Sequence, residues 1–118
     1  MYRSPTYRRV DLRSEGWALQ GVRVLASSFE RFSGIEAEGR SPVMLLTRSV
    51  HSFTVGRPLG IIVLDLAGTV VRTDVLRPRR IIGFGARRWV VETEAGADLP
   101  AQGDEIIAST MSIRCLEH

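Results

Sequence analysis

The stretch 60–65, with the sequence GIIVLD, decides the fold class, because it carries no polar side chain before its final aspartate. A half-buried strand alternates apolar and polar side chains, whereas a short run that is apolar throughout is typical of a strand buried on both faces. Turn residues follow in Leu66-Ala67-Gly68, and 69–76 has the pattern of a returning strand. We predict a hairpin with a buried first strand, in which Asp65 is a turn residue.

Short strands separated by turn residues continue on both sides of this hairpin. Strands are predicted at 21–26, 43–47, 51–55, 81–84, 89–93 and 105–110. One short helix is predicted near 28–32, because Ser27-Ser28-Phe29-Glu30 matches a capping box. Gly83-Phe84-Gly85 is predicted to be a bend and not a phosphate-binding loop. The expected fold class is mainly β, a single jelly-roll-like sandwich or barrel with one short α-helix.

The chain has the length and composition of one globular domain. It contains 118 residues, of which 44% are hydrophobic. Residues 1–16 are polar without an apolar period, and we expect a mobile tail there, with a strand near its end. The β-rich domain is expected over 17–115, and residues 116–118 resemble the start of a purification tag. A lone cysteine, Cys115, can form neither an internal disulfide nor a cysteine zinc site.

Charge and hydropathy narrow the classes of partner. No apolar run reaches the roughly 18 residues of a membrane span, and the N-terminus lacks the apolar core of a signal peptide. We expect a cytoplasmic protein, or an exported one if a leader has been removed. All 16 basic residues are arginine, yet the net charge is only +3 because acids are interspersed. So weak a field argues against a dedicated nucleic-acid-binding domain, and codon bias explains the missing lysine as simply as anion binding does.

The middle of the chain carries a family resemblance. Its segments are Ser49-Val50-His51-Ser52-Phe53, Arg57-Pro58-Leu59, and Ile61-Ile62-Val63-Leu64-Asp65 with Gly68. They resemble the core motif of the domain of unknown function 192 family of bacterial and archaeal proteins, and shorter similarities keep the family's order over 21–108. The resemblance implies a small jelly-roll β-sandwich with a short helix and no assigned biochemical activity. Because some relatives carry export signals or are encoded near pilus-assembly or secretion genes, it also implies a link to those processes.

The chain departs from the family pattern at two places. Val55 and Gly56 stand where the family often has a methionine and a basic residue, and Gly60 stands where it often has an aspartate. Any function that depends on that aspartate is therefore in doubt for this chain.

His51 is the one histidine outside the last three residues. Catalysis through it would require an orienting carboxylate and a nucleophile within hydrogen-bond reach. Ser49 and Ser52 are near in sequence, but neither has the setting of a nucleophile elbow, and no spacing of ligands supports a metal site. A structural role is the simplest interpretation of His51, and a hydrolase-like enzyme is the alternative.

A ligand site, if one exists, is predicted at His51, Arg57 and Arg87. Each lies at the end of a predicted element, in a segment similar to the family, where side chains can converge without breaking strand pairing. Two guanidinium groups and an imidazole favour an anionic or hydroxyl-rich ligand. The hypothesis requires that these ends meet at one end of the domain.

Two further groups of residues, one of arginines and one of carboxylates, each allow a structural and a functional interpretation. The arginines Arg77, Arg79, Arg80, Arg87 and Arg88 lie near Phe84 and Trp89, and the carboxylates of interest are Glu92, Glu94 and Asp98. Arginines interleaved with aromatics can bind single-stranded nucleic acid, and paired carboxylates can hydrolyse glycosides. In the structural interpretation, both groups are solvated and the aromatics belong to the core.

The sequence therefore predicts a function only in outline. It indicates no cofactor and no metal, and it favours a non-enzymatic module that binds a small polar or anionic ligand or a protein partner. The module would be linked through its family to secretion or pilus assembly. The alternatives are a hydrolase-like enzyme using His51 and a weak nucleic-acid binder that uses its arginines.

Overall fold

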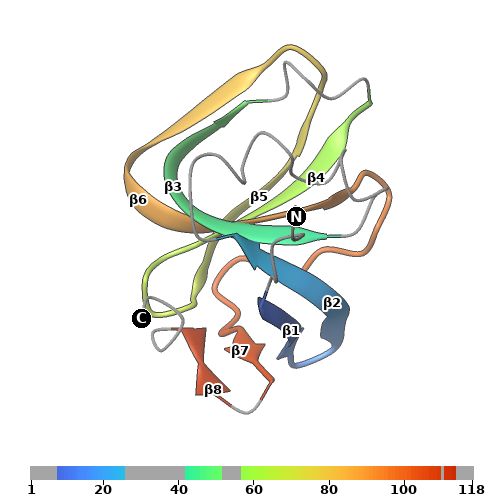
Figure 1. Ribbon diagram of the computed structural model, residues 1–118, viewed down its shortest axis with the longest axis vertical. Coiled ribbons are helices and arrows are strands. Elements are labelled where there is room, and N and C mark those ends of the chain that lie inside the picture. Colours follow the sequence, from blue (N-terminus) through green and yellow to red (C-terminus); the bar gives the residue numbers. More distant parts are fainter. Residues whose placement is uncertain (1–7, 26–41, 52–56, 110, 114–118) are drawn as a thin grey trace, which may run out of the picture.

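The computed structural model describes residues 8–25, 42–51, 57–109 and 111–113, and they form one curled eight-stranded sheet (Figure 1). Its strands are β1 (Arg8–Ser14), β2 (Trp17–Leu25), β3 (Val43–His51), β4 (Leu59–Leu64), β5 (Val70–Leu76), β6 (Ile81–Glu94), β7 (Ile107–Ala108) and β8 (Met111–Ser112). The spatial order is β5-β4-β6-β3-β2-β1-β7-β8, with every neighbouring pair antiparallel except β2 and β3. The mainly β fold that the sequence predicts is confirmed.

Strand β4 lies between β5 and β6 and is buried along its whole length. Successive side chains of a strand point to opposite faces, so β4 supplies both faces of the sheet. Ile62 and Leu64 pack into one apolar core, and Ile61 and Val63 pack into a second. The prediction that this apolar run is buried on both faces is confirmed.

The β4–β5 turn is held by Asp65, as its place in the sequence predicts. The carboxylate Oδ1 of Asp65 accepts the backbone N–H groups of Ala67 at 2.9 Å and Thr69 at 3.0 Å. Its carbonyl oxygen accepts the N–H of Gly68, whose φ of +100° is a left-handed conformation that glycine adopts without a steric penalty.

The segment before β7 returns to this hairpin. The N–H of Val70 donates to the carbonyl of Asp104, and the N–H of Gly103 donates to the carbonyl of Val70, both at 2.8 Å. Ile106 donates to Gly68 in the same way. The start of β5 is therefore already paired on its outer side, and a late part of the chain covers the turn.

The sheet begins before residue 17, with a strand near the end of the predicted tail. Residues 8–14 form β1 and pair with β2, so that only 1–7 of the expected tail lie outside the described residues. Val10 and Leu12 are buried in the first core, while Asp11 and Arg13 face solvent. The alternation covers few residues, and the apolar pair is flanked and separated by charged residues, which made the pattern hard to detect.

Two predicted strand breaks are wrong. β3 runs without interruption to His51, which ends its described part and does not open a new strand, and β6 runs through Gly83-Phe84-Gly85. The predicted bend is a bulge: Thr47 pairs with Arg88 but Ser49 pairs with Gly83, so residues 84–87 lie opposite Arg48 alone. A bulge of this kind bends a strand without ending it.

Some predictions fall where the structure describes little or nothing. The helix near 28–32 and residues 52–55 of the predicted strand 51–55 lie outside the described residues. Within the described ranges the secondary structure is β-strand, turn and a single 3₁₀ position, with no α-helix. Of the predicted strand 105–110, the pair Ile107–Ala108 is regular β-strand and Glu105 forms an isolated bridge with Thr69.

Two buried tryptophans of the first core differ in how their indole N–H groups are satisfied. Trp17 Nε1 donates to the carbonyl of Asp98 at 2.9 Å. Trp89 Nε1 is buried, and no acceptor among the described residues reaches it. A buried donor without an acceptor costs about 1–3 kcal/mol of stability.

Replacing each tryptophan by phenylalanine separates these two situations. We expect Trp17→Phe to lower the free energy of unfolding by about 1 kcal/mol more than Trp89→Phe, because only Trp17→Phe removes a hydrogen bond. Urea denaturation of the two variants measures the difference. An equal or larger loss for Trp89→Phe would contradict the assignment.

Among the glycines that the structure describes, Gly68 is predicted to be the least tolerant of substitution. A Cβ at this position would lie 2.8 and 2.9 Å from side-chain carbons of Ile113 and 3.0 Å from the carbonyl oxygen of Ile106, in addition to the strain of φ +100°. We expect Gly68→Ala to lower the free energy of unfolding by about 2–4 kcal/mol in urea denaturation.

Gly96→Ala is the matched control, because Gly96 has a φ of +95° with nothing within 4 Å of its Cβ position. It carries the backbone strain alone, which is about 1–2 kcal/mol. Equal losses in the two variants would show that the close approach of Ile113 and Ile106 does not matter.

Candidate partner-binding edge

β5 forms one edge of the sheet and is the longest edge strand that the structure describes (Figure 1). Val70 alone is bonded on the side away from β4, to residues 103 and 104; nothing else in the described ranges pairs there. Val71 is 36% exposed and Val75 is 49% exposed, which is unusual for large apolar side chains on a strand. An open, apolar edge strand is a template on which another strand can pair.

The backbone of Val75 points outward. Its N–H donates to the Oδ1 of the preceding residue, Asp74, at 2.8 Å, so it is not used in the ladder with β4. A bulge at Val71 reverses the alternation that Val70 begins, and beyond it alternate residues direct their backbone groups to the same side, so that Thr73 also faces outward. In register, Thr73 is paired with Ile62, and Val75 with Gly60.

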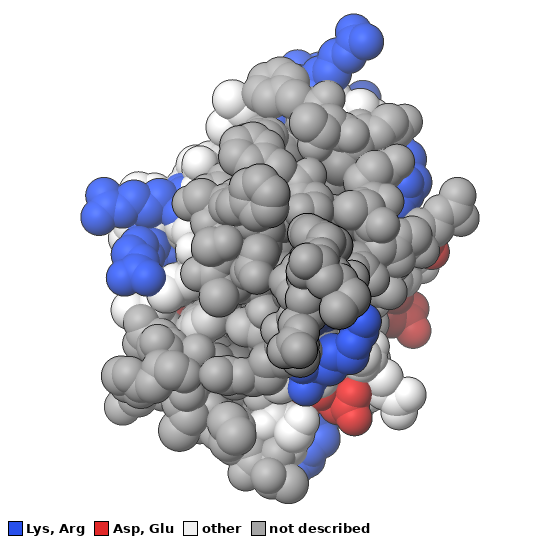
Figure 2. Space-filling model, in the orientation of Figure 1, with Lys and Arg blue, Asp and Glu red and all other residues white. Residues whose placement is uncertain are grey.

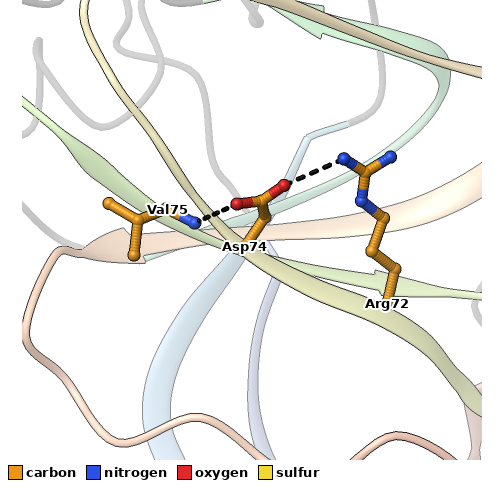
Figure 3. A network of polar contacts seen from close by, with 3 residues as sticks. All are labelled: Arg72, Asp74 and Val75. Atoms are coloured by element: carbon orange, nitrogen blue, oxygen red, sulfur yellow. Dashed lines mark hydrogen bonds and ion pairs between the residues drawn. The ribbon is translucent and has the colours of Figure 1, made fainter.

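Arg72 and Asp74 form the charged pair of this edge, as Figure 3 shows. Arg72 Nη2 donates to Asp74 Oδ2 at 2.9 Å, while the other carboxylate oxygen holds the Val75 amide. The Arg72 hydrogen bond, followed by the Val75 amide, lowers the pKa of Asp74 below its ordinary value of 3.8. Because both side chains are about half exposed, the pair contributes less than about 1 kcal/mol.

The carboxylate of Asp74 therefore protects the edge without closing it. It satisfies one outward amide and places a charge beside the exposed valines, and natural sheets use edge charges in this way to limit pairing with other chains. An incoming strand that offers a carbonyl to Val75 and a charge to Arg72 or Asp74 can replace these local contacts.

The structure distributes the predicted ligand residues over three elements. His51 is the last described residue of β3 and its backbone pairs with Ile81, whereas Arg87 is an exposed residue of the β6 bulge. The two are on one ladder, and at about 3.3 Å per residue they lie no more than roughly 20 Å apart along it. Arg57 precedes β4, with Nε and Nη2 buried. A ligand site shared by the three stays a prediction.

The arginine cluster is spread over the fold. Arg77, Arg79 and Arg80 are exposed in the β5–β6 loop, Arg87 is exposed and Arg88 is half-buried. In the view of Figure 2, blue side chains lie at several places: at the top, on the left, on the right, and in the lower part beside a red side chain. The two aromatics are occupied: Trp89 belongs to the first core and Phe84 packs against the second. The structural interpretation thus holds for Trp89, which is buried, whereas Phe84 is half-buried against the second core.

Arg23 is the residue whose environment the sequence did not reveal. It lies on β2, opposite Val22 and Val24 as predicted, but it is 0% exposed. It pairs in register with Val43, which pairs with Glu92, so the three form one row across β2, β3 and β6. The alternation of side chains along β2 predicts that Arg23 lies on the face opposite Val22 and Val24. That this face is buried follows only from the curl of the sheet.

The three carboxylates of interest differ in burial. Glu94 and Asp98 are exposed, whereas Glu92 is half-buried on β6, which lies between β4 and β3 and is not an edge strand. In the described ranges no group of three or more His, Cys, Asp or Glu side chains could hold a metal ion. The same ranges contain no helix with the length and apolar character that crossing a bilayer requires.

Comparison with known proteins gives no information on the function of this chain, so the proposed function is argued from the structure. No family model, no curated protein and no solved structure matches this chain.

The Asp74 carboxylate is predicted to control the Val75 amide. A carboxyl whose pKa is lowered in the folded state stabilises the fold above its unfolded pKa, and this stabilisation is lost as the pH falls through the folded pKa. We therefore expect the amide proton of Val75 to shift in NMR spectra at a pH below 3.8, together with the Asp74 carboxyl carbon.

Asp74→Asn is the control, since it keeps the shape of the side chain and removes its titration. In that variant the Val75 amide should no longer titrate. A Val75 amide that titrates identically in both proteins would show that another group is responsible.

Proposed function

We propose that this chain is a non-enzymatic partner-binding module that accepts an extended segment of a protein along the open edge of β5. The observation that carries the proposal is the outward N–H of Val75, which a side chain holds in place of a neighbouring strand. In this mode of recognition, main-chain hydrogen bonds supply affinity and alternate side chains supply specificity.

The side chains around the edge suit such a segment. Val71 and Val75 offer apolar surface, and Arg72 and Asp74 offer one charge of each sign. Binding at this place needs neither a pocket nor a catalytic group. We include in the proposal membership of the domain of unknown function 192 family, its jelly-roll topology and its link to secretion or pilus assembly, on the strength of the motif resemblance.

A blocked strand peptide tests whether the edge can accept a partner. The probe is the blocked peptide acetyl-Lys-Thr-Val-Thr-Val-Thr-Lys-amide, titrated into the ¹⁵N-labelled chain. We expect shift changes and added exchange protection at the outward amides of Thr73 and Val75. Val75→Pro should weaken binding roughly tenfold, because it removes one outward donor worth about 1.4 kcal/mol.

Val75→Pro is a fair variant because the Val75 N–H is not part of the β4 ladder and proline is tolerated on edge strands. Ile81→Ser is the matched control for non-specific apolar binding, since Ile81 is 63% exposed but lies on β6. Peptide shifts that survive Val75→Pro and vanish in Ile81→Ser would place binding elsewhere and refute the proposal.

A further inference from the structure

We infer that the strand which β5 accepts is β5 of a second copy of this chain, paired antiparallel about a two-fold axis at Thr73. The inference rests on the open edge of the proposed function and names its partner. A two-fold contact uses the same surface on both copies, so it requires that the edge be complementary to itself. The order of residues along β5 meets that requirement.

Around Thr73 the charges of β5 are arranged with opposite signs at equal distances. Arg72 lies one residue before the centre and Asp74 one residue after it. Antiparallel pairing centred on Thr73 therefore sets Arg72 opposite Asp74 of the second copy, and Asp74 opposite Arg72 of the second copy. Opposite charges directly across a strand pair stabilise it, whereas like charges there destabilise it.

The exposed valines do not share this symmetry. Arg72 pairs with Val63 and Val70 pairs with Leu64, so the register shift between these two pairs leaves Val71 as a bulge residue outside the ladder. Val75, which is 49% exposed, lies beyond the bulge and would lose water contact in the pair. Burying apolar area of this kind is favourable by about 25 cal/mol per Å².

The backbone directions agree with this register. Thr73 faces outward together with Val75, so the central Thr73 residues of the two copies would exchange N–H···O=C bonds in both directions. Residues 72 and 74 face β4, which makes each 72–74 pair the non-hydrogen-bonded kind, with Cα atoms closer and side chains in contact. The charges thus meet at the positions where cross-strand side chains interact most strongly.

Only residues 72–75 are available for regular pairing, because Val71 is the bulge residue and Val70 is already bonded to Gly103 and Asp104. So short an interface falls below the roughly 1,200 Å² of stable complexes, and a weak, reversible dimer follows. We expect a dissociation constant on the order of 10⁻⁴ M. The Val75 amide would exchange its Asp74 contact for the second copy.

Charge exchange along β5 tests the inference. We expect sedimentation equilibrium to show dimerisation of the unaltered chain, and a dissociation constant at least tenfold higher for Arg72→Asp and for Asp74→Arg measured alone. An equimolar mixture of the two variants should dimerise again to within about threefold of the unaltered chain, because each charge then meets its opposite across the axis. Amide spectra establish that both variants are folded.

A second measurement tests the pairing register of the two β5 strands. In a dimer of differently labelled copies, the α-proton of Arg72 should show a nuclear Overhauser effect to the α-proton of Asp74 in the other copy. A chain that stays monomeric at about 1 mM, or a mixture of folded variants that does not associate, overturns the inference. The blocked peptide lacks the Arg72–Asp74 arrangement and pairs through its backbone. Its binding without dimerisation therefore leaves the proposed function intact and identifies a different partner. Failure of both experiments overturns both.

Discussion

The rest of the structure depends on the burial of β4 on both of its faces. A strand with no solvent-facing side needs apolar layers above and below it and a hydrogen-bonded neighbour on each flank. β5 and β6 supply the flanks, and the two cores supply the layers. The sheet then curls because the same few strands must serve both cores in a chain of this size.

The exposed character of β5 follows from this arrangement. β5 completes the pairing of β4, and among the described strands none completes the pairing of β5 beyond Val70. The strand that protects the most buried part of the fold is therefore its most accessible edge. Arg72 and Asp74 are placed where such an edge needs charge, and the same two side chains determine what it can accept.

The sequence predicted the parts of the fold that depend on local pattern. The run at 60–65, the Asp65 turn and the returning strand are each encoded within a few residues, and the structure has all three. The missed features are not local. The burial of Arg23 depends on the curl of the sheet, and the continuity of β3 depends on a bulge in β6. The edge at β5 could not be predicted, because strand order across the sheet leaves no mark in the sequence of the strand itself.

The bonds that tie Val70 and Gly68 to residues 103–106 also bear on how the chain is made. During synthesis the β4–β5 hairpin is complete once Leu76 has emerged, but its outer side is covered only after Ile106 follows. At roughly 5–20 residues per second, this interval lasts a few seconds. During this interval the open edge of β5 also includes Val70, and the turn at Gly68 is uncovered. Neighbouring nascent chains on one messenger RNA would meet while this edge is unpaired and could pair with each other. The spacing of the ribosomes would then affect the fraction of chains that misassemble during folding.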